Sequence, residues 1–235
     1  MNTLDIAAIG LQQDLDRLRQ TSQNVANLGT PGYKRQVAVQ QAFEDLVNQT
    51  AEVRVHTDPH AGKLVSTGQP LDVALPQGRY LLVESDDGAQ ALTRQGALQF
   101  DADGFLRTAA GRKVLGGGGP IAVSSELRSE VVIDAQGQLK AEGRVLDALR
   151  LIRPAAGRPL VPLGSGLYAA DSTGWDADSA TAEVRGGQLE LSNVMPSQEM
   201  VNLMAAARHA ETMVRLFQAA DDMQGTAIRR FGENN

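Results

Sequence analysis

Apolar side chains recur at regular intervals along the N-terminal end of the chain. Seven positions follow alternating steps of four and three residues, and all but the sixth are apolar: Leu4, Ala8, Leu11, Leu15, Leu18, Ser22 and Val25. This heptad spacing predicts a helix over residues 3–27 whose apolar stripe packs against another helix. Gly29 and Pro31 are expected to end it, because glycine accepts the left-handed cap conformation and proline does not continue a helix.

The C-terminal end carries the same kind of pattern. Steps of three and four residues alternate through ten positions, eight of them apolar: Met200, Leu203, Ala207, Ala210, Val214, Phe217, Asp221, Gln224, Ile228 and Phe231. A second long helix is predicted, beginning near Pro196, which suits a first-turn position. Glu199 in its first turn and Arg229 and Arg230 in its last suit the helix dipole. The two polar positions of the stripe are typical of residues that specify register.

Each apolar stripe is one half of an interface between helices. The periodicity is compatible with two kinds of partner for each stripe. The two helices can pair within one chain, as a hairpin closed through the middle of the sequence, or they can pack between copies of the chain. A heptad helix without a partner leaves its stripe exposed, so in the second case the ends are expected to fold on assembly.

The middle of the chain predicts short strands and tight turns. Residues 62–187 contain 19 of the 24 glycines. Strands are expected at 71–75 and 80–83, with a turn at 86–88. A hairpin is expected where 97–100 meets 105–107 across Asp101-Ala102-Asp103-Gly104. A related Asp-Ala-x-Gly-x-Leu segment at 134–139 predicts a second hairpin.

Composition narrows the classes of function. The chain has 235 residues, a net charge of −6 and no cysteine, which excludes disulfides, thiolate metal sites and a cysteine nucleophile. An acidic balance argues against nucleic-acid binding, which needs a cationic surface. No apolar run approaches the roughly 20 residues that span a bilayer, so no membrane insertion is expected. The first ten residues lack a basic start followed by an apolar stretch, so no cleaved signal peptide is expected.

Candidate reactive groups are few, and we expect no catalytic, cofactor or metal site. His56 and His60 have a chelating spacing for a helix, but Pro59 between them and the lack of a third ligand favour a solvated loop. Asp101 to Gly104 resembles the start of a calcium loop, yet Arg112 occupies the position that needs glutamate. His209 is expected at a surface or an interface.

Two segments are more specific. The first runs from Thr21 to Arg35 as TSQNVANLGTPGYKR, and the second is Leu189-Glu190-Leu191-Ser192-Asn193-Val194. Both resemble motifs of the bacterial flagellar basal-body rod and hook family. The segments 68–75, 92–96 and 104–121 resemble that family in the right order. Two departures stand out, namely Pro-Gln-Gly-Arg-Tyr at 76–80 where Gly-Asp-Gly-Phe-Phe is usual, and Leu191 where glycine is common.

The resemblance implies an α+β protein with terminal heptad helices in a coiled-coil-like element and a glycine-rich β middle. It divides the chain into a rod helix and turn (1–32), an extended linker (33–70), a β-rich outer domain (71–187) and a second rod helix (188–235). It implies a structural, non-enzymatic rod subunit, most similar to proximal rod members, that polymerises through its terminal helices and transmits torque from motor to hook. A distal rod subunit is the alternative.

The resemblance also implies partners and interface residues. The partners are copies of the chain, other rod proteins and the flagellar export apparatus, in the rod that spans the periplasm. The expected subunit-interface side chains are Leu4, Leu11, Leu15, Leu18, Val25, Met200, Leu203, Val214, Phe217 and Ile228. The residues expected to fix the helix ends and turns are Asn24, Asn27, Gly29, Thr30, Pro31, Gly32, Tyr33, Leu189, Glu190, Ser192 and Asn193.

Two other classes of function compete with this interpretation. A peptidoglycan hydrolase needs a positioned carboxylate pair, and the sequence singles out none. A coiled-coil adaptor module outside the flagellum would form a discrete oligomer with its helical ends already folded.

Overall fold

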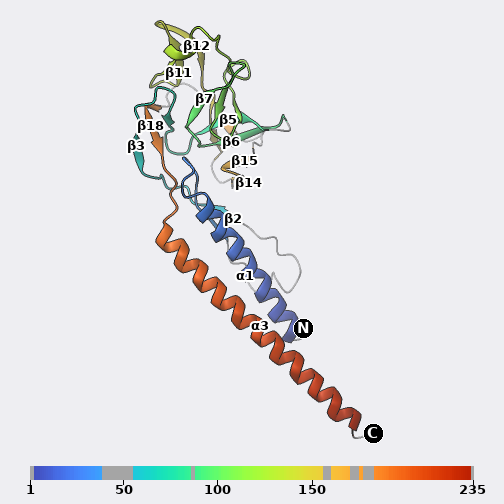
Figure 1. Ribbon diagram of the computed structural model, residues 1–235. Helices are drawn as coiled ribbons and strands as arrows, with labels where there is room; N and C mark the ends of the chain where they lie inside the picture. Colours follow the sequence, from blue (N-terminus) through green and yellow to red (C-terminus); the bar gives the residue numbers. More distant parts are fainter. Residues whose placement is uncertain are drawn as a thin grey trace. The chain divides into compact units, whose positions relative to one another are not determined.

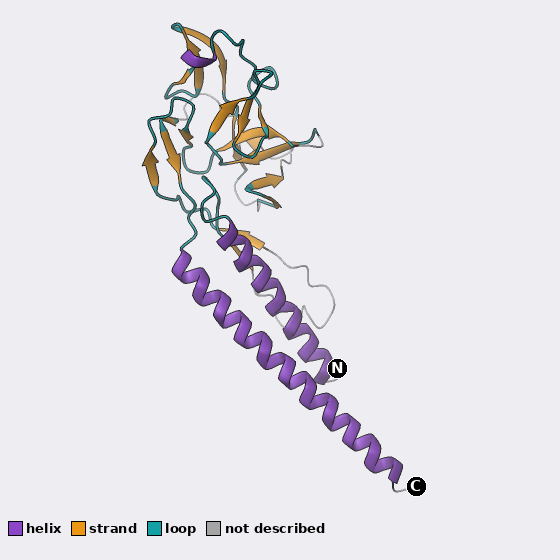
Figure 2. Cartoon of the chain, in the orientation of Figure 1, coloured by secondary structure: helices purple, strands orange, loops and turns teal. Residues whose placement is uncertain are grey.

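A computed structural model describes residues 3–38, 55–85, 88–155, 160–169, 175–176 and 183–233 (Figure 1). The chain divides into two compact units. The helical unit comprises Met1–Ala26, Gln36–Val55 and Met195–Asn235, and the β unit comprises Asn27–Arg35 and His56–Val194. The architecture is therefore α+β, with two long helices and many short strands (Figure 2).

In the helical unit, α1 (Thr3–Ala26) lies antiparallel to α3 (Pro196–Glu233) (Figure 1). Both helices begin and end close to the bounds that the apolar pattern predicts, which confirms those two elements. Pro196 occupies the first position of α3, where its missing N–H leaves no helical hydrogen bond unmade. The coiled-coil geometry expected from the heptads stays a prediction.

One register relates the two helices. The Asp14 carboxylate lies 2.5 Å from Nδ1 of His209, and Asn24 Nδ2 donates to Glu199 Oε2 at 3.2 Å. Gly10 faces Met213. The two residue numbers add to 223 in each of these pairs, so the start of α1 lies near Ala220 and residues 221–233 of α3 extend beyond it (Figure 2).

The strands are short and numerous. Their bounds are β1 (Gln36–Ala38), β2 (Val55–Thr57), β3 (Leu64–Ser66), β4 (Val73–Ala74), β5 (Tyr80–Glu84), β6 (Gln90–Thr93), β7 (Leu98–Phe100), β8 (Leu106–Thr108), β9 (Lys113–Val114), β10 (Val132–Ile133), β11 (Gln138–Ala141), β12 (Arg144–Ala148), β13 (Leu151–Pro154), β14 (Pro162–Gly164), β15 (Leu167–Ala169), β16 (Trp175–Asp176), β17 (Arg185–Gly186) and β18 (Gln188–Glu190). A short 3₁₀ helix, η1, covers Arg128–Glu130.

The main sheet of the β unit has the order β14-β15-β6-β5-β9-β8-β7, and β13 pairs with β5 and β16. Smaller sheets are β10-β11-β12, β17-β4 and β18-β3. Alternate residues of β5 enter two apolar clusters, with Leu81 and Val83 in the larger and Tyr80 and Leu82 in the smaller. Side chains alternate between the two faces of a strand, so these two clusters bury β5 on both faces. Burial on both faces explains why the sequence of β5 is a continuous apolar run.

The predicted hairpins are confirmed. β7 and β8 pair antiparallel across the turn at residues 101–105, and β10 pairs with β11 across residues 134–137. The strand expected at 71–75 is shorter than predicted, because the Asp72 amide closes a turn onto the carbonyl of Gln69 and Pro76 follows. The turn expected at 86–88 lies largely outside the described residues.

Candidate functional site

The two sequence motifs meet in the β unit. The Gly32 amide donates to the Glu190 carbonyl at 2.7 Å, and the Asn193 amide donates to the Tyr33 carbonyl at 3.3 Å. Gly32 has φ of +71°, and a Cβ there would lie 2.1 Å from the Arg94 carbonyl oxygen. The Thr-Pro-Gly-Tyr turn therefore needs glycine at position 32 both for its conformation and for its close approach to the backbone at Arg94, just after β6.

A buried ion cluster lies beneath this contact. One Glu190 oxygen accepts from Lys34 Nζ at 2.6 Å, and the other accepts from Arg94 Nη2 at 2.5 Å and Arg94 Nε at 3.0 Å. The Gly62 amide donates to the first oxygen at 2.8 Å. All three ionised side chains are at most 3% exposed. The cluster of Lys34, Arg94 and Glu190 thus joins segments from three distant parts of the sequence.

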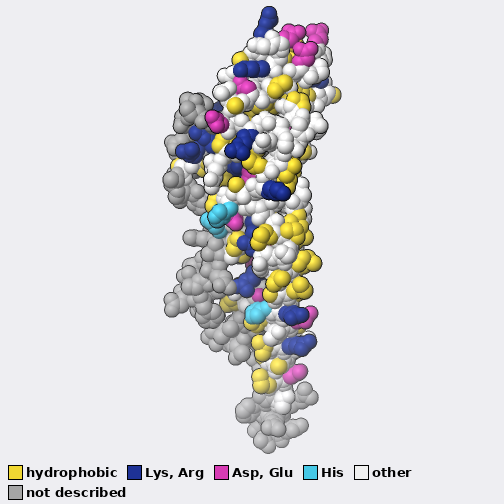
Figure 3. All heavy atoms as spheres, turned by 90° about the vertical axis from the view of Figure 1, so that its left-hand side faces the viewer, with side chains coloured by type: hydrophobic (Ala, Val, Ile, Leu, Met, Phe, Trp, Pro, Cys, Tyr) yellow, Lys and Arg dark blue, Asp and Glu magenta, His cyan; other side chains and the backbone are white. Residues whose placement is uncertain are grey.

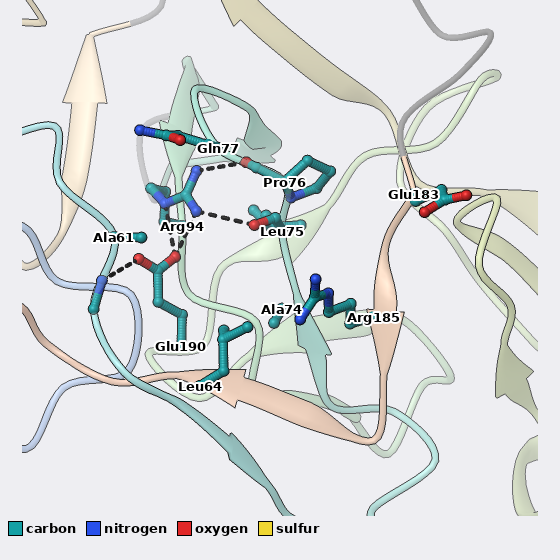
Figure 4. A pocket seen from close by; sticks show the side chains of 11 residues that line it. Ala61, Leu64, Ala74, Leu75, Pro76, Gln77, Arg94, Glu183, Arg185 and Glu190 are labelled. Atoms are coloured by element: carbon teal, nitrogen blue, oxygen red, sulfur yellow. Dashed lines mark hydrogen bonds and ion pairs between the residues drawn. The ribbon is translucent and has the colours of Figure 1, made fainter.

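Arg94 makes five hydrogen bonds, one for each N–H of its guanidinium group. Besides its two bonds to Glu190, it donates to the carbonyl of Arg79 at 2.6 Å. It also donates to the carbonyls of Pro76 and Leu75 at 3.0 and 3.1 Å (Figure 4). These carbonyls belong to the loop between β4 and β5. Every N–H group of the Arg94 guanidinium therefore has an acceptor within the protein and contributes to the fold.

The three tyrosines of the chain gather around the cluster. Tyr33, Tyr80 and Tyr168 are at most 4% exposed. The guanidinium carbon of Arg94 lies 5.5 Å from the Tyr80 ring centre, and the Tyr80 and Tyr168 rings meet edge to face at 5.6 Å. Burial raises the pKa of both Tyr80 and Tyr168. Tyrosine absorbance and fluorescence therefore report on the integrity of this region.

Opposing effects set the pKa values within the cluster. Burial raises the pKa of Glu190, but Arg94, Lys34 and the Gly62 amide favour its carboxylate form and together hold the pKa below its usual range. Burial lowers the pKa of Lys34, against the opposite effect of Glu190. The Glu190 carboxylate is thus stabilised by its partners in the folded protein.

We expect the β unit to lose stability on acidification from about pH 7 to about pH 3. A carboxyl group whose pKa is lower in the folded state contributes stability above its unfolded pKa of roughly 4.3, and that contribution is lost as pH falls through the folded pKa. Asp58, Asp101 and Asp134 also have lowered pKa values and act in the same direction. Urea unfolding followed by tyrosine fluorescence at several pH values measures the loss, and Glu190→Gln should remove part of it. A flat profile would contradict this expectation.

Asn193 makes a second junction. Its Oδ1 accepts from the Arg35 amide at 2.6 Å, and its Nδ2 donates to the carbonyls of Asp58 and His60 at 3.3 and 3.0 Å. The Asp58 amide donates to the Arg35 carbonyl at 2.8 Å. One side chain thus joins the segments at 35, 58–60 and 193.

The remaining motif residues have local roles. Asn24 is in α1, and its amide side chain spans Gln36 N and O at 3.0 and 2.8 Å. Thr30 bonds Asn27 through its hydroxyl and its amide, as expected of the turn after the helix. Ser192 Oγ accepts from the Val194 amide at 3.3 Å, and Leu189 pairs with Val65 between β18 and β3. Gly29 and Pro31 are part of the turns after α1.

The expected interface positions lie on the helices, and those whose side chains the structure describes are not among the buried residues of α1 and α3. Among the described side chains of α1 and α3, the buried ones are polar or small, namely Asp14, Thr21, Asn24, Glu199, Ala206 and Ala220. Leu15, Met200, Val214 and Phe217 are 38–51% exposed, while Leu11, Leu18, Val25 and Leu203 are half-buried. Leu4 lies in α1 and Ile228 in α3. Figure 3, in which α3 faces the viewer, shows apolar side chains following that helix.

The described residues contain few other groups that could bind a metal ion or a ligand. His60 is exposed and lies 2.5 Å from Asp58, and His56 is exposed in β2. Within the described ranges, no three His, Asp or Glu side chains are grouped to hold a metal ion. A cavity of about 210 Å³ next to the ion cluster is lined by Leu64, Gln77, Arg185 and neighbouring residues (Figure 4). None of the described helices is long and apolar enough to cross a membrane.

Sequence reasoning missed the partners of Glu190. Lys34 and Arg94 stood inside recognised motifs, but they are 156 and 96 residues away along the chain. A cationic residue within each of these motifs was the only available signal. His209 was expected at a surface or an interface, and the structure places it at the α1–α3 contact with Asp14.

Comparison with known proteins identifies two matching families. Residues 77–141 match the flagellar hook protein FlgE/F/G D1 domain, and residues 185–230 match the C-terminal region of flagellar basal body rod FlgEFG proteins. The flagellar basal-body rod proteins FlgF of Salmonella typhimurium and of Escherichia coli K12 are each 32% identical to the chain, over 92% of both sequences. The FlgG rod protein of Agrobacterium fabrum is 28% identical, over 95% of this chain and 97% of its own.

Proposed function

This chain belongs to the family of flagellar basal-body rod proteins, and we propose that it is a proximal-type subunit that polymerises through its terminal helices. It is a structural subunit of the rod in the flagellar basal body, where rod proteins assemble with one another. The higher identity to two proteins named FlgF than to one named FlgG supports the FlgF type. Torque transmission from motor to hook and delivery by the export apparatus are parts of the same proposal.

The exposed apolar side of the helices carries this proposal. Leu15, Val214 and Phe217 follow the heptad pattern, yet the contact between α1 and α3 leaves them about 40% exposed. Residues 221–233 of α3 also run past the start of α1. An apolar stripe on α3 that extends past the end of its partner helix α1 suits a head-to-tail contact with another subunit. Contacts of this kind do not form a closed ring but build a filament.

A non-enzymatic role is supported by how the buried ions are used. Every N–H of the Arg94 guanidinium group and both oxygens of Glu190 have hydrogen-bond partners within the protein, which supports a role for these groups in the fold. We further propose the four-part division at 1–32, 33–70, 71–187 and 188–235, with the helix positions named in the sequence analysis as interface residues.

Electron microscopy of basal bodies from cells lacking only this chain tests the role. We expect rods that stop before the hook, and a stop close to the inner end supports the proximal position. A stop further out would favour the distal alternative. Complete rods with hooks would overturn the proposal.

Leu15→Ala and Phe217→Ala are expected to weaken assembly. Each truncation of an apolar side chain buried between subunits costs about 2–5 kcal/mol, which corresponds to at least about thirtyfold in association. Sedimentation of polymers formed from the purified chain measures the effect. The exposed neighbour Gln218→Ala serves as the control, and equal polymer yields for Phe217→Ala and Gln218→Ala would contradict the assigned interface.

A further inference from the structure

The contact between α1 and α3 contains buried polar side chains at regular intervals. Asp14, Asn24 and Glu199 are each 1% exposed. In a helix pair, positions of this kind are normally apolar, because burying a polar group costs free energy unless it is hydrogen-bonded. Their burial at this contact calls for a role that apolar side chains do not provide.

Each of these groups has a partner across the contact. Asp14 lies 2.5 Å from His209 Nδ1 and 3.9 Å from Arg17 on its own helix. Asn24 donates to Glu199 across the contact at 3.2 Å. The two cross-helix pairs are ten residues apart on each helix and share one register, so both are satisfied at the same time.

The half-buried apolar side chains that flank this contact, Leu11, Leu18, Val25 and Leu203, do not by themselves define that register. A heptad repeat looks nearly the same after a slip of seven residues. One such slip would place Asp14 opposite Leu216 and Asn24 opposite Ala206, and each would lose its partner on α3. The opposite slip would carry Asn24 past the start of α3 at Pro196 and separate Asp14 from His209.

We propose that the pairs Asp14–His209 and Asn24–Glu199, here called the register pairs, select a single alignment of α1 with α3. A slipped helix, or a foreign heptad helix without matching polar groups, leaves a buried carboxylate uncompensated and is rejected. The register pairs thus determine which helix α1 accepts. Their consequence for rod building rests on the proposed function, whereas the register itself is a property of the isolated chain.

Cysteine cross-linking reads the register directly, because the chain has no cysteine of its own. The pair Gly10→Cys with Met213→Cys reports the native register. The pairs Gly10→Cys with Ala206→Cys and Gly10→Cys with Ala220→Cys report slips of one heptad in either direction. Each pair is placed in the otherwise native full chain and in an Asp14→Leu/Glu199→Leu background, oxidised, and scored by gel mobility of the monomer.

In the native background we expect the Gly10–Met213 pair to dominate. In the Leu background we expect slipped cross-links to rise by about tenfold, because leucine packs in every register. The matched control, Ser22→Leu/Gln218→Leu, adds the same side chains on exposed positions and should leave the pattern unchanged. Circular dichroism verifies that the helices form in each variant.

An unchanged cross-linking pattern in the Leu background would overturn the inference. So would slipped cross-links of equal strength in the native chain. Neither result tests the proposed role as a rod subunit, which is tested by electron microscopy of basal bodies from cells lacking the chain. The register proposal and the proposed function can therefore be refuted independently.

Discussion

Replacing Glu190 with alanine is expected to lower the unfolding free energy of the β unit by about 3–5 kcal/mol. The change removes the one carboxylate of the ion cluster and leaves Lys34 and Arg94, at most 3% exposed, without it. The favourable attraction within a buried ion pair is partly offset by desolvation, but removing one partner leaves the whole desolvation cost of the others. The loss therefore exceeds that of an ordinary hydrogen bond, which is about 1 kcal/mol.

Urea unfolding followed by tyrosine fluorescence measures this loss, because all three tyrosines lie at the cluster. Glu183→Ala is a matched control, since Glu183 lines the same cavity but is exposed (Figure 4). We expect the control to change stability by less than about 0.5 kcal/mol. Equal effects of the two variants would refute the role assigned to Glu190.

Gly96→Ala is the second substitution with a large expected effect. A Cβ at this position would lie 1.7 Å from the Val73 carbonyl oxygen, and the Val73 amide donates to the Gly96 carbonyl at 2.9 Å. The added methyl group has to displace backbone on both sides of this contact, next to Arg94. We expect a loss of about 3 kcal/mol or more, above the 1–3 kcal/mol typical of overpacking by side chains.

Thermal and urea unfolding of the full chain measure this effect. Gly117→Ala is the control, because nothing lies within 4 Å of a Cβ at Gly117 and its backbone has no positive φ. The two variants carry the same chemical change, so their difference isolates the steric contact. A Gly96→Ala protein as stable as the Gly117→Ala protein would show that the backbone yields easily here.

The helices were predictable because their information is local. The heptad pattern and the stop at Gly29 to Pro31 place α1, and Pro196 marks the start of α3. The hairpins at 101 and 134 follow from their Asp and Gly turn residues. Within such elements, each residue is fixed by neighbours a few positions away.

The ion cluster and the face of contact between the helices were not predictable in the same way. Burial of a lysine such as Lys34 contradicts its usual exposure, and only a partner 156 residues away makes it tolerable. Likewise, the apolar stripe marks Leu15 and Phe217 for an interface, whereas the contact within the chain is centred on Asp14, Asn24 and Glu199. The periodicity of apolar residues identifies an apolar face of a helix. Polar side chains that pair across a contact determine which face packs against which helix.

The junction at Asn193 has a consequence for how such proteins diversify. The chain leaves the β unit near residue 35, enters it again near residue 58 and leaves it near residue 193. Asn193 hydrogen-bonds to both of the other segments. Anything inserted between residues 60 and 190 therefore starts and finishes at nearly the same point. Such an arrangement tolerates insertion and exchange of whole segments. The segment between residues 60 and 190 can therefore become longer or shorter, or be exchanged as a whole, while the spacing of its two ends stays unchanged.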